Sequence, residues 1–321
     1  MLGFRKGGGG DRFFYGLTGA FALFLVLMVG AIAVVLWSES RESIQKFGLG
    51  FWESSTWDPV MGEFGAAPFI WGTLYSSIIA LLIATPVALG IAIFLVELCP
   101  NQLKTPLVFL TELLASIPSI VYGLWGIFVL VPAIRSLQLM LPDWIRAMPL
   151  FSGPPVGVSL LTAAVVLSIM IVPYTSSVAR EVLKAVPNAQ REGAYALGST
   201  RWEATLVALH YARTGIIGAI MLGFGRALGE TMAVTMVIGN SPKALWSLFA
   251  PQYTMAAVIA NEFAEAADNL HLSALVEVGL VLFTITLVIN AGSRLLIFSM
   301  QRERKPKATP VVAVPATEGR A

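Results

Sequence analysis

Six long apolar runs dominate the pattern of hydrophobic and polar positions. They cover approximately residues 13–37, 68–97, 106–132, 158–179, 214–240 and 273–299. Each run is long enough for a helix to cross a hydrocarbon core about 30 Å thick. The runs lack the alternation of outer-membrane barrel strands, and an open strand cannot satisfy its backbone in lipid. The pattern therefore predicts an all-α integral membrane protein with six transmembrane helices. Three of the runs contain a proline that is expected to kink its helix: Pro86, Pro118 and Pro173.

The composition agrees with this prediction. Charged residues make up 12% of the 321 residues and hydrophobic residues 56%, whereas a soluble domain has about 25% charged residues. The formal net charge of +2 is too small to indicate binding to nucleic acid. The single cysteine, Cys99, excludes an internal disulfide and a cysteine-rich metal site.

The first apolar run has two interpretations. Basic residues precede it, and the small residues Ala31 and Ala33 resemble a signal-peptidase site. However, the run is longer than the roughly 7–15 apolar residues of a signal peptide. We therefore expect a retained first transmembrane helix.

The lysines and arginines of the loops predict the orientation of the chain. Fourteen of the 21 lie in the N-terminus, the 98–105 loop, the 180–213 loop and the C-terminal tail, and only five lie in the opposite loops. Because basic residues concentrate in cytoplasmic loops, both termini are expected in the cytoplasm of a bacterial plasma membrane protein. The predicted parts are 1–67, with the first span and an outside loop; 68–300, with five spans; and 301–321, a disordered tail.

The 180–213 loop has strong helix signals. Pro187 and Asn188 are typical of a helix start, and Gly198 is typical of a helix end. The pattern from Thr200 to Glu203 then fits a capping box for a second helix. We expect two helices separated by a glycine break on the cytoplasmic face. They form either an amphipathic linker or a docking site for a cytosolic protein.

Within the first of these helices, the side chains divide into two groups. Ala194, Tyr195 and Leu197 are expected to form its apolar side. Arg191 and Glu192 are expected to point toward water or a partner.

Two opposite charges interrupt the fifth apolar run. Arg226 and Glu230 are four residues apart, so a continuous helix places them on one face, about 6 Å apart along the axis. Each charge costs roughly 2.5–3.5 kcal/mol at the middle of a span. They form either a buried ion pair that fixes helix packing or the lining of an anion path, in which Glu230 holds Arg226 while the path is empty. Gly225 and Gly229 favour close helix packing.

Other polar segments leave structural roles open. Residues 253–267 have the pattern of a short amphipathic helix on the outer side, which either binds a partner or plugs the bundle. Glu112 is expected to contact the 180–213 loop, and Glu277 to lie near the outer end of the sixth span. Arg294 is expected to reach the inner interface.

Several motifs resemble those of type I ABC-importer permeases. "EGA" at 192–194 followed by Gly198 resembles the E-A-A-x-x-x-G motif of that superfamily. "IPSIVYG" (117–123), "GRALGETMAV" (225–234) and "VIANEFAEA" (258–266) resemble its phosphate-specific branch more narrowly. The resemblance covers roughly residues 12–300. Two departures are Gly193, where the superfamily has alanine, and Leu209-His210, where it has Leu-Pro; the second makes the position of the second loop helix uncertain.

The resemblance implies a fold, a function and a set of partners. The fold is the MetI-like permease fold with cytoplasmic coupling helices, and the function is passage of inorganic phosphate driven by ATP. The implied partners are a second homologous permease, two copies of an ATPase that holds ATP and magnesium, and an extracytoplasmic phosphate-binding protein. Arg226 and Glu230 correspond to residues of the phosphate path. The ATPase would contact the loop at Arg191, Glu192, Gly193, Ala194, Tyr195 and Gly198.

The sequence offers no motif for catalysis by this chain alone. It has no G-x-x-x-x-G-K-[ST] phosphate loop, H-E-x-x-H or G-x-S-x-G pattern, so ATP hydrolysis is expected in a partner and no cofactor in this chain. A permease for another oxyanion, such as sulfate or molybdate, is an alternative. A secondary transporter that acts alone would need internal repeats, and none is evident. A membrane scaffold or signalling subunit is a third class.

Overall fold

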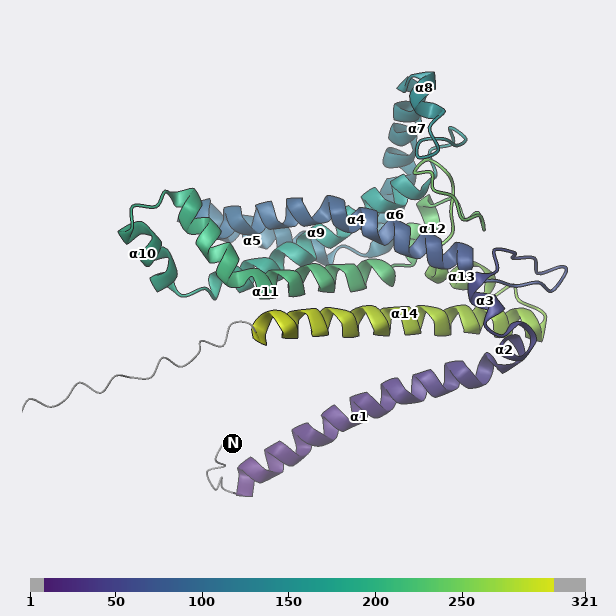
Figure 1. Cartoon of the computed structure of the whole chain (residues 1–321), viewed down its shortest axis with the longest axis horizontal. Helices are drawn as coiled ribbons and strands as arrows, with labels where there is room; N and C mark the ends of the chain where they lie inside the picture. Colours follow the sequence, from purple (N-terminus) through teal and green to yellow (C-terminus); the bar gives the residue numbers. More distant parts are fainter. Residues whose placement is uncertain (1–8, 303–321) are drawn as a thin grey trace, which may run out of the picture.

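The computed structural model describes residues 9–302, and the regular secondary structure of these residues is helical (Figure 1). Within these residues the extended pairings are two isolated bridges, Asp58 with Glu63 and Gly239 with Gln252. The first half of the chain contains α1 (Gly9–Glu39), α2 (Arg41–Phe47), α3 (Gly50–Glu53), α4 (Ala67–Ile93), the π-helix η1 (Phe94–Leu98), α5 (Asn101–Ser116), α6 (Ser119–Trp125), the π-helix η2 (Gly126–Leu130), α7 (Val131–Met140) and α8 (Asp143–Arg146). The second half contains α9 (Leu160–Lys184), α10 (Asn188–Ala196), α11 (Arg201–Leu228), α12 (Met232–Val237), α13 (Met255–Glu262) and α14 (Asn269–Arg302). The tail predicted to be disordered lies almost entirely outside the described residues.

Six helices of the described chain are long and apolar enough to cross a membrane, as predicted. Two spans differ from the sequence prediction. The run 106–132 is not one helix, because α5 ends before Pro118 and α6 starts after it; by length and composition the candidate span is Ser119–Met140. The run 214–240 is not one helix either, since α11 starts at Arg201 and ends at Leu228. The residue before a proline avoids helical geometry, which explains the first break.

The packing of α4 against α9 forms the centre of the fold. The buried face of α4 carries small residues at four-residue intervals: Ser76, Ala80, Ala84, Ala88 and Ala92. Small side chains let two helix backbones approach closely, which is how helices associate in lipid. In the most apolar stretch of α9, 61% of the residues are buried inside the chain, whereas in the corresponding stretch of α1 none is buried. The helix α9 is therefore the central helix of the bundle.

The first helix lies at the periphery. In Figure 1, α1 diverges from the parallel group of α4, α9, α11 and α14 and approaches only the outer part of α14. Most of its apolar side chains are exposed, from Phe13 to Trp37. Such a helix is stable in lipid, where exposed apolar side chains carry no penalty.

An aromatic cluster closes the end of the bundle opposite α10. Trp57 packs edge-on against Phe64 and Phe69, with ring centroids 4.9 and 4.8 Å apart. The Trp57 Nε1–H donates to Glu262 Oε2 at 2.9 Å, and His271 Nε2 lies 3.2 Å from the same oxygen. This network fixes α13 to the 54–66 loop and α14.

The first part of the segment 253–267 acts as a plug within the chain. Residues Met255 to Val258 are buried in the core below the aromatic cluster. Tyr253 is also buried, and this burial raises the pKa of its phenol to about 12. The first part of the segment therefore acts as a plug, whereas Phe263 to Glu265 are exposed, and partner binding stays a prediction.

The close contact of α4 with the outer layer gives a test of the packing. A Cβ at Gly72 would clash with the backbone oxygen of Tyr253, whereas a Cβ at Gly90 in the same helix meets nothing within 4 Å. We expect Gly72→Ala to lower the free energy of unfolding by about 1–3 kcal/mol, the usual effect of overpacking. Gly90→Ala is the matched control and is expected to be neutral or stabilising by up to about 1 kcal/mol. Thermal unfolding of the purified protein in detergent measures both, and equal midpoints for the two variants would contradict the packing described here.

Candidate functional site

Arg226 and Glu230 lie at a break in the membrane-embedded chain. Arg226 is in the last turn of α11, which ends at Leu228, and Glu230 lies in the link before α12. The prediction that the two charges share one continuous helical face is therefore wrong. Glu230 Oε1 instead accepts a weak hydrogen bond from the Ala233 backbone N–H at 3.4 Å. Each charge stabilises a helix end, since cations favour the C-terminus of a helix and carboxylates the N-terminus.

Arg226 is exposed on the surface of this chain. Its guanidinium carbon lies 5.8 Å from the centre of the Tyr174 ring of α9, a cation–π contact. Among the described residues, no ion pair joins Arg226 to Glu230 or to another carboxylate. The structure thus does not support the hypothesis that Glu230 holds Arg226 in the isolated chain. An exposed guanidinium in hydrocarbon costs several kcal/mol, so this surface requires a polar cavity or another subunit.

A second helix break lies next to the first. The short helix α6, which follows the break at Pro118, packs closely on α12, which follows the break at Glu230. A Cβ at Gly123 would come within 2.6 Å of Met236 Sδ and 3.1 Å of Ala233 Cα, so glycine is required for this approach. Irregular backbone at membrane depth is tolerated only where protein buries it or where it lines a polar cavity. The paired breaks therefore make the region around Arg226 the candidate functional site.

The glycine that allows close helix packing at the end of α11 is not one of the two that the sequence predicted. A Cβ at Gly223 would clash with Thr175, so Gly223 is the residue that brings α11 close to α9. A Cβ at Gly225 or Gly229 would make only ordinary contacts, at 3.9 Å, with Asn290 Oδ1 and the Gly225 carbonyl oxygen respectively, so neither position requires glycine. The prediction that this pair packs helices together is not met within the chain, and these residues leave the surface beside Arg226 open.

The helix α10 has the start and end predicted from the sequence. Pro187 is its N-cap, and Gly198 follows its last turn with φ of +84°. The Gly198 N–H donates to Tyr195 O at 2.9 Å and the Ser199 N–H to Ala194 O at 3.2 Å. This pair of bonds is a Schellman motif, which requires a left-handed residue and explains the glycine.

The capping box at Thr200 and Glu203 is confirmed. The Thr200 N–H donates to Glu203 Oε2 at 2.7 Å, and the Glu203 N–H donates back to Thr200 Oγ1 at 3.4 Å. However, the helix that it starts is α11, which continues into the membrane to Leu228. The second helix of the loop is therefore not separate, and His210 lies inside α11.

The outward face of α10 carries exposed side chains. Glu192 and Gly193 are exposed, Tyr195 is 49% exposed and Leu197 is 89% exposed. Ala194 is the buried residue of this helix and packs toward α11. Tyr195 and Leu197, expected on the apolar side with Ala194, thus lie on the surface while Ala194 is buried. Exposed large apolar residues next to each other are typical of an interaction surface.

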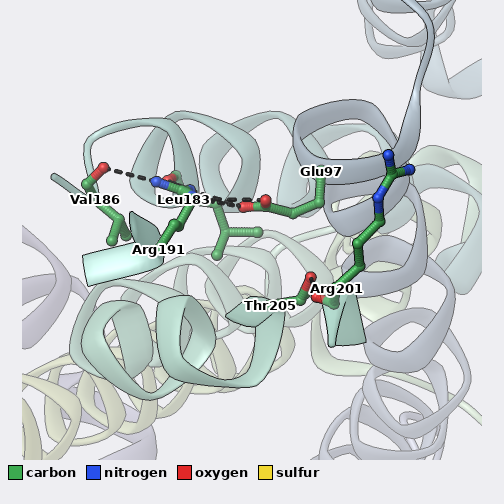
Figure 2. A network of polar contacts seen from close by, with 6 residues as sticks. All are labelled: Glu97, Leu183, Val186, Arg191, Arg201 and Thr205. Atoms are coloured by element: carbon green, nitrogen blue, oxygen red, sulfur yellow. Dashed lines mark hydrogen bonds and ion pairs between the residues drawn. The ribbon is translucent and has the colours of Figure 1, made fainter. Parts of the chain in front are cut away.

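Arg191 does not point toward water, in contrast to its prediction. Figure 2 shows its guanidinium directed at Glu97. Arg191 Nη2 and Nε donate to Glu97 Oε1 at 2.7 and 3.0 Å, and Nη1 donates to the Val186 carbonyl at 2.9 Å. The side chains of Arg191 and Glu97 are only 15% and 13% exposed. Sequence reasoning missed Glu97 because 94 residues separate it from Arg191.

Two further carboxylates, the exposed Glu112 and the buried Glu277, have structural positions. Glu112 of α5 pairs with Arg180 of α9 at 3.1 Å, which confirms the expected contact of Glu112 with the start of the 180–213 segment. Glu277 is buried on α14 beside a cavity of about 400 Å³ that Trp37, Leu49 and Trp52 also line. Neither carboxylate lies at the helix breaks.

Comparison with known proteins places the chain in a family. Residues 66–302 match the family described as "Binding-protein-dependent transport system inner membrane component". The chain therefore belongs to this family of multi-pass membrane subunits of transport systems.

The relatives of this chain within the family share one name, that of a phosphate transport permease. The chain is 47% identical over 290 residues to the "Phosphate transport system permease protein PstC" of Mesorhizobium japonicum, with 88% of this chain and 89% of the relative covered. It is 48% identical over 300 residues to the protein of the same name from Haemophilus influenzae, with 92% and 95% covered. A more distant relative is the "Probable phosphate transport system permease protein PstC" of Methanocaldococcus jannaschii, at 41% identity over 77% of this chain and 81% of the relative.

A solved structure confirms the fold. A chain of the MetNI methionine ABC transporter in an inward-facing conformation matches with a TM-score of 0.53 at 16% identity, over 72% of this chain and 93% of that chain. At this identity the match carries the fold alone. The predicted all-α, MetI-like permease fold is confirmed.

The two glycines of the α10 segment give a matched pair of variants. A Cβ at Gly193 meets nothing within 4 Å, so Gly193→Ala is expected to stabilise α10 by about 1 kcal/mol. Gly198→Ala forces a left-handed alanine and is expected to destabilise the end of α10 by roughly 1–2 kcal/mol. Amide hydrogen exchange over residues 188–199 of the purified protein measures this, with slower exchange in the first variant and faster exchange in the second. Equal exchange in both would contradict the Schellman geometry.

Proposed function

We propose that this chain is the membrane-spanning permease subunit of an ATP-driven importer that passes inorganic phosphate across the plasma membrane. Membership in the binding-protein-dependent family supports the transport role. The names of the relatives, which share 41–48% identity with the chain, support phosphate as the substrate. In this proposal the chain itself has no catalytic role, and ATP with magnesium is hydrolysed by a partner.

The observation that carries the proposal is the exposed Arg226 at the break between α11 and α12. A guanidinium keeps its charge at all physiological pH values and can bind a phosphate oxygen pair through two parallel N–H donors. Tyr174 beneath it orients the side chain, and no carboxylate within the described chain neutralises it. An arginine in this state is available to a passing oxyanion, and its position at a helix end rather than mid-helix gives the anion access to it.

A second homologous permease would cover the Arg226 surface. The exposed residues around it include Leu222 and Met232, so the surface combines one charge with apolar side chains. Such a surface is suited to a subunit interface with a polar path along its centre. We propose that the phosphate path lies there, with Arg226 and Glu230 from this chain facing it.

Two copies of an ATPase subunit would drive transport by ATP hydrolysis. One of these copies would bind the surface of α10. The exposed Tyr195 and Leu197 support a partner in this position. In Figure 1 the start of α1, the end of α14 and α10 all lie at one end of the molecule, which supports cytoplasmic termini beside the ATPase. The extracytoplasmic binding protein would then deliver phosphate to the opposite end.

Removal of the guanidinium tests the proposed substrate path. Arg226→Ala is expected to lower phosphate uptake by about 10²-fold, because it removes a charge-assisted, two-donor contact worth about 3 kcal/mol. Arg294→Ala is the matched control, since Arg294 is another exposed arginine of a spanning helix but lies on α14, away from the breaks. Uptake of radiolabelled phosphate, sulfate and molybdate by cells that carry each variant is the measurement.

Three results would count against the proposal. The first is unchanged phosphate uptake in Arg226→Ala, which would remove Arg226 from the path. The second is wild-type uptake of sulfate or molybdate in preference to phosphate, which would correct the substrate. The third is an equal loss in the Arg294→Ala control, which would indicate damage to the fold.

A further inference from the structure

We propose that Glu97 is a positioning residue for energy coupling: through Arg191 it fixes α10 to the inner end of α4, so that movement of α10 is transmitted to the membrane helices. This inference rests on the proposed function, in which α10 contacts an ATPase. It assigns a role to a carboxylate outside the helix breaks and outside the exposed face of α10. It also gives Arg191 a role within the chain instead of on the partner.

The geometry of the ion pair is specific. Arg191 approaches Glu97 with Nε and Nη2, at 3.0 and 2.7 Å from Oε1, and Nε also lies 3.3 Å from Oε2. Two N–H donors of one guanidinium on one carboxylate define an orientation as well as a distance. Both side chains are largely shielded from water, so solvent screens this pair less than a surface pair.

Glu97 is presented by an unusual turn. The end of α4 widens into the π-helix η1, in which the Cys99 N–H donates to the Phe94 carbonyl at 2.8 Å. A π-helical turn is rare and occurs frequently at functional sites. It places Glu97 on the side of η1 that faces α10 (Figure 2). The local backbone is thus consistent with a role beyond packing.

Arg191 joins a third element to the pair. Its guanidinium also donates to the carbonyls of Leu183 and Val186, at 3.1 and 2.9 Å, at the end of α9. A cation is favourable there because the last carbonyls of a helix lack partners and carry partial negative charge. One side chain of α10 therefore binds both α4, through η1, and α9, which are the two helices at the centre of the fold.

Apart from this ion pair, α10 packs mainly against α11. Short links, 185–187 and 197–200, connect it to α9 and α11, and Ala194 is its only residue classed as buried among those described. A force on the exposed face of such a helix would bend the links unless a stiffer contact opposes it. The Glu97–Arg191 ion pair is that contact. The small-residue packing of α4 on α9 then carries the displacement toward the helix breaks.

A double variant separates positioning from stability. Glu97→Met or Arg191→Met alone leaves one shielded charge without its partner, which destabilises a protein whatever the function of the pair. The double variant has no unpaired charge, and replacement of a shielded ion pair by apolar residues of similar volume is commonly tolerated. It should therefore assemble, yet lack the directional link. Arg201→Gln is the matched control, because Arg201 lies in the same region but makes no contact with Glu97 (Figure 2).

The experiment uses the complete transporter, with its ATPase and binding protein, reconstituted in liposomes. Phosphate uptake and ATP hydrolysis are measured together, and their ratio is the readout that a purely structural role would not change. We expect the double variant to assemble with the ATPase and hydrolyse ATP, while phosphate taken up per ATP falls roughly tenfold or more. The Arg201→Gln control should keep the wild-type ratio.

Two failures are distinguishable. A wild-type ratio in the assembled double variant, next to an active wild-type transporter, overturns the coupling role of Glu97 and leaves the proposed function intact. Absence of phosphate uptake by the wild-type complex overturns the proposed function and with it this inference. Failure of the double variant to assemble, while each single variant assembles, also overturns the inference, because the pair would then be required for assembly rather than for transmission.

Discussion

The close approach of α4 to α9 is the contact on which the rest of the structure depends. In lipid no hydrophobic effect drives two helices together, so association relies on dispersion contacts between closely packed backbones. The alanines and serines of α4 allow this approach along its length, from the outer to the inner end. At the outer end Gly72 continues it against Tyr253, and at the inner end Ala92 packs beside Leu183. A rigid central pair results, to which the other helices attach.

Around this pair, charge is placed where the helices end. Arg226 closes α11, Glu230 precedes α12, and Arg191 lies on the last carbonyls of α9. A charge at a helix terminus interacts with the partial charges of unpaired backbone groups, which offsets part of its desolvation. The break after Leu228 therefore does two things. It makes a membrane arginine energetically tolerable, and it leaves that arginine accessible from outside the chain.

The sequence allowed much of this architecture to be predicted, and the failures have physical causes. Hydropathy detects apolar length, so the six spans and the helical fold follow from it. Hydropathy cannot detect a break when both halves are apolar, as at Glu230. The cue there was local: Gly229 and Thr231 flank the carboxylate, and both are poor helix formers. The local signals at Gly198, Thr200 and Glu203 predicted α10 and the start of α11 correctly, since caps depend on neighbours only.

Contacts between distant residues set the limit of such reasoning at the site. An amphipathic pattern predicts which face of α10 is polar, but it cannot tell whether a polar residue meets water or a buried carboxylate. Arg191 and Glu192 are adjacent and similarly polar, yet one is held by Glu97 and the other is exposed. The same limit applies to glycine. Gly223 is needed because Thr175 lies opposite, whereas a Cβ at Gly225, two residues later, would make only an ordinary contact with Asn290 Oδ1 at 3.9 Å.

The two ends of α11 are connected through the same helices. Its C-terminal end presents Arg226 beside Tyr174 of α9. Its N-terminal end follows α10, which Arg191 joins to α9 and η1. A displacement of α10 that moves α9 relative to α11 would change the position of Tyr174 beneath the guanidinium. Because packed helices shift as units rather than deform continuously, a small movement at the α10 end of the bundle can alter the Arg226 surface at the helix breaks. The fold thus offers a physical route between the surface that would bind an ATPase and the charge that would meet an anion.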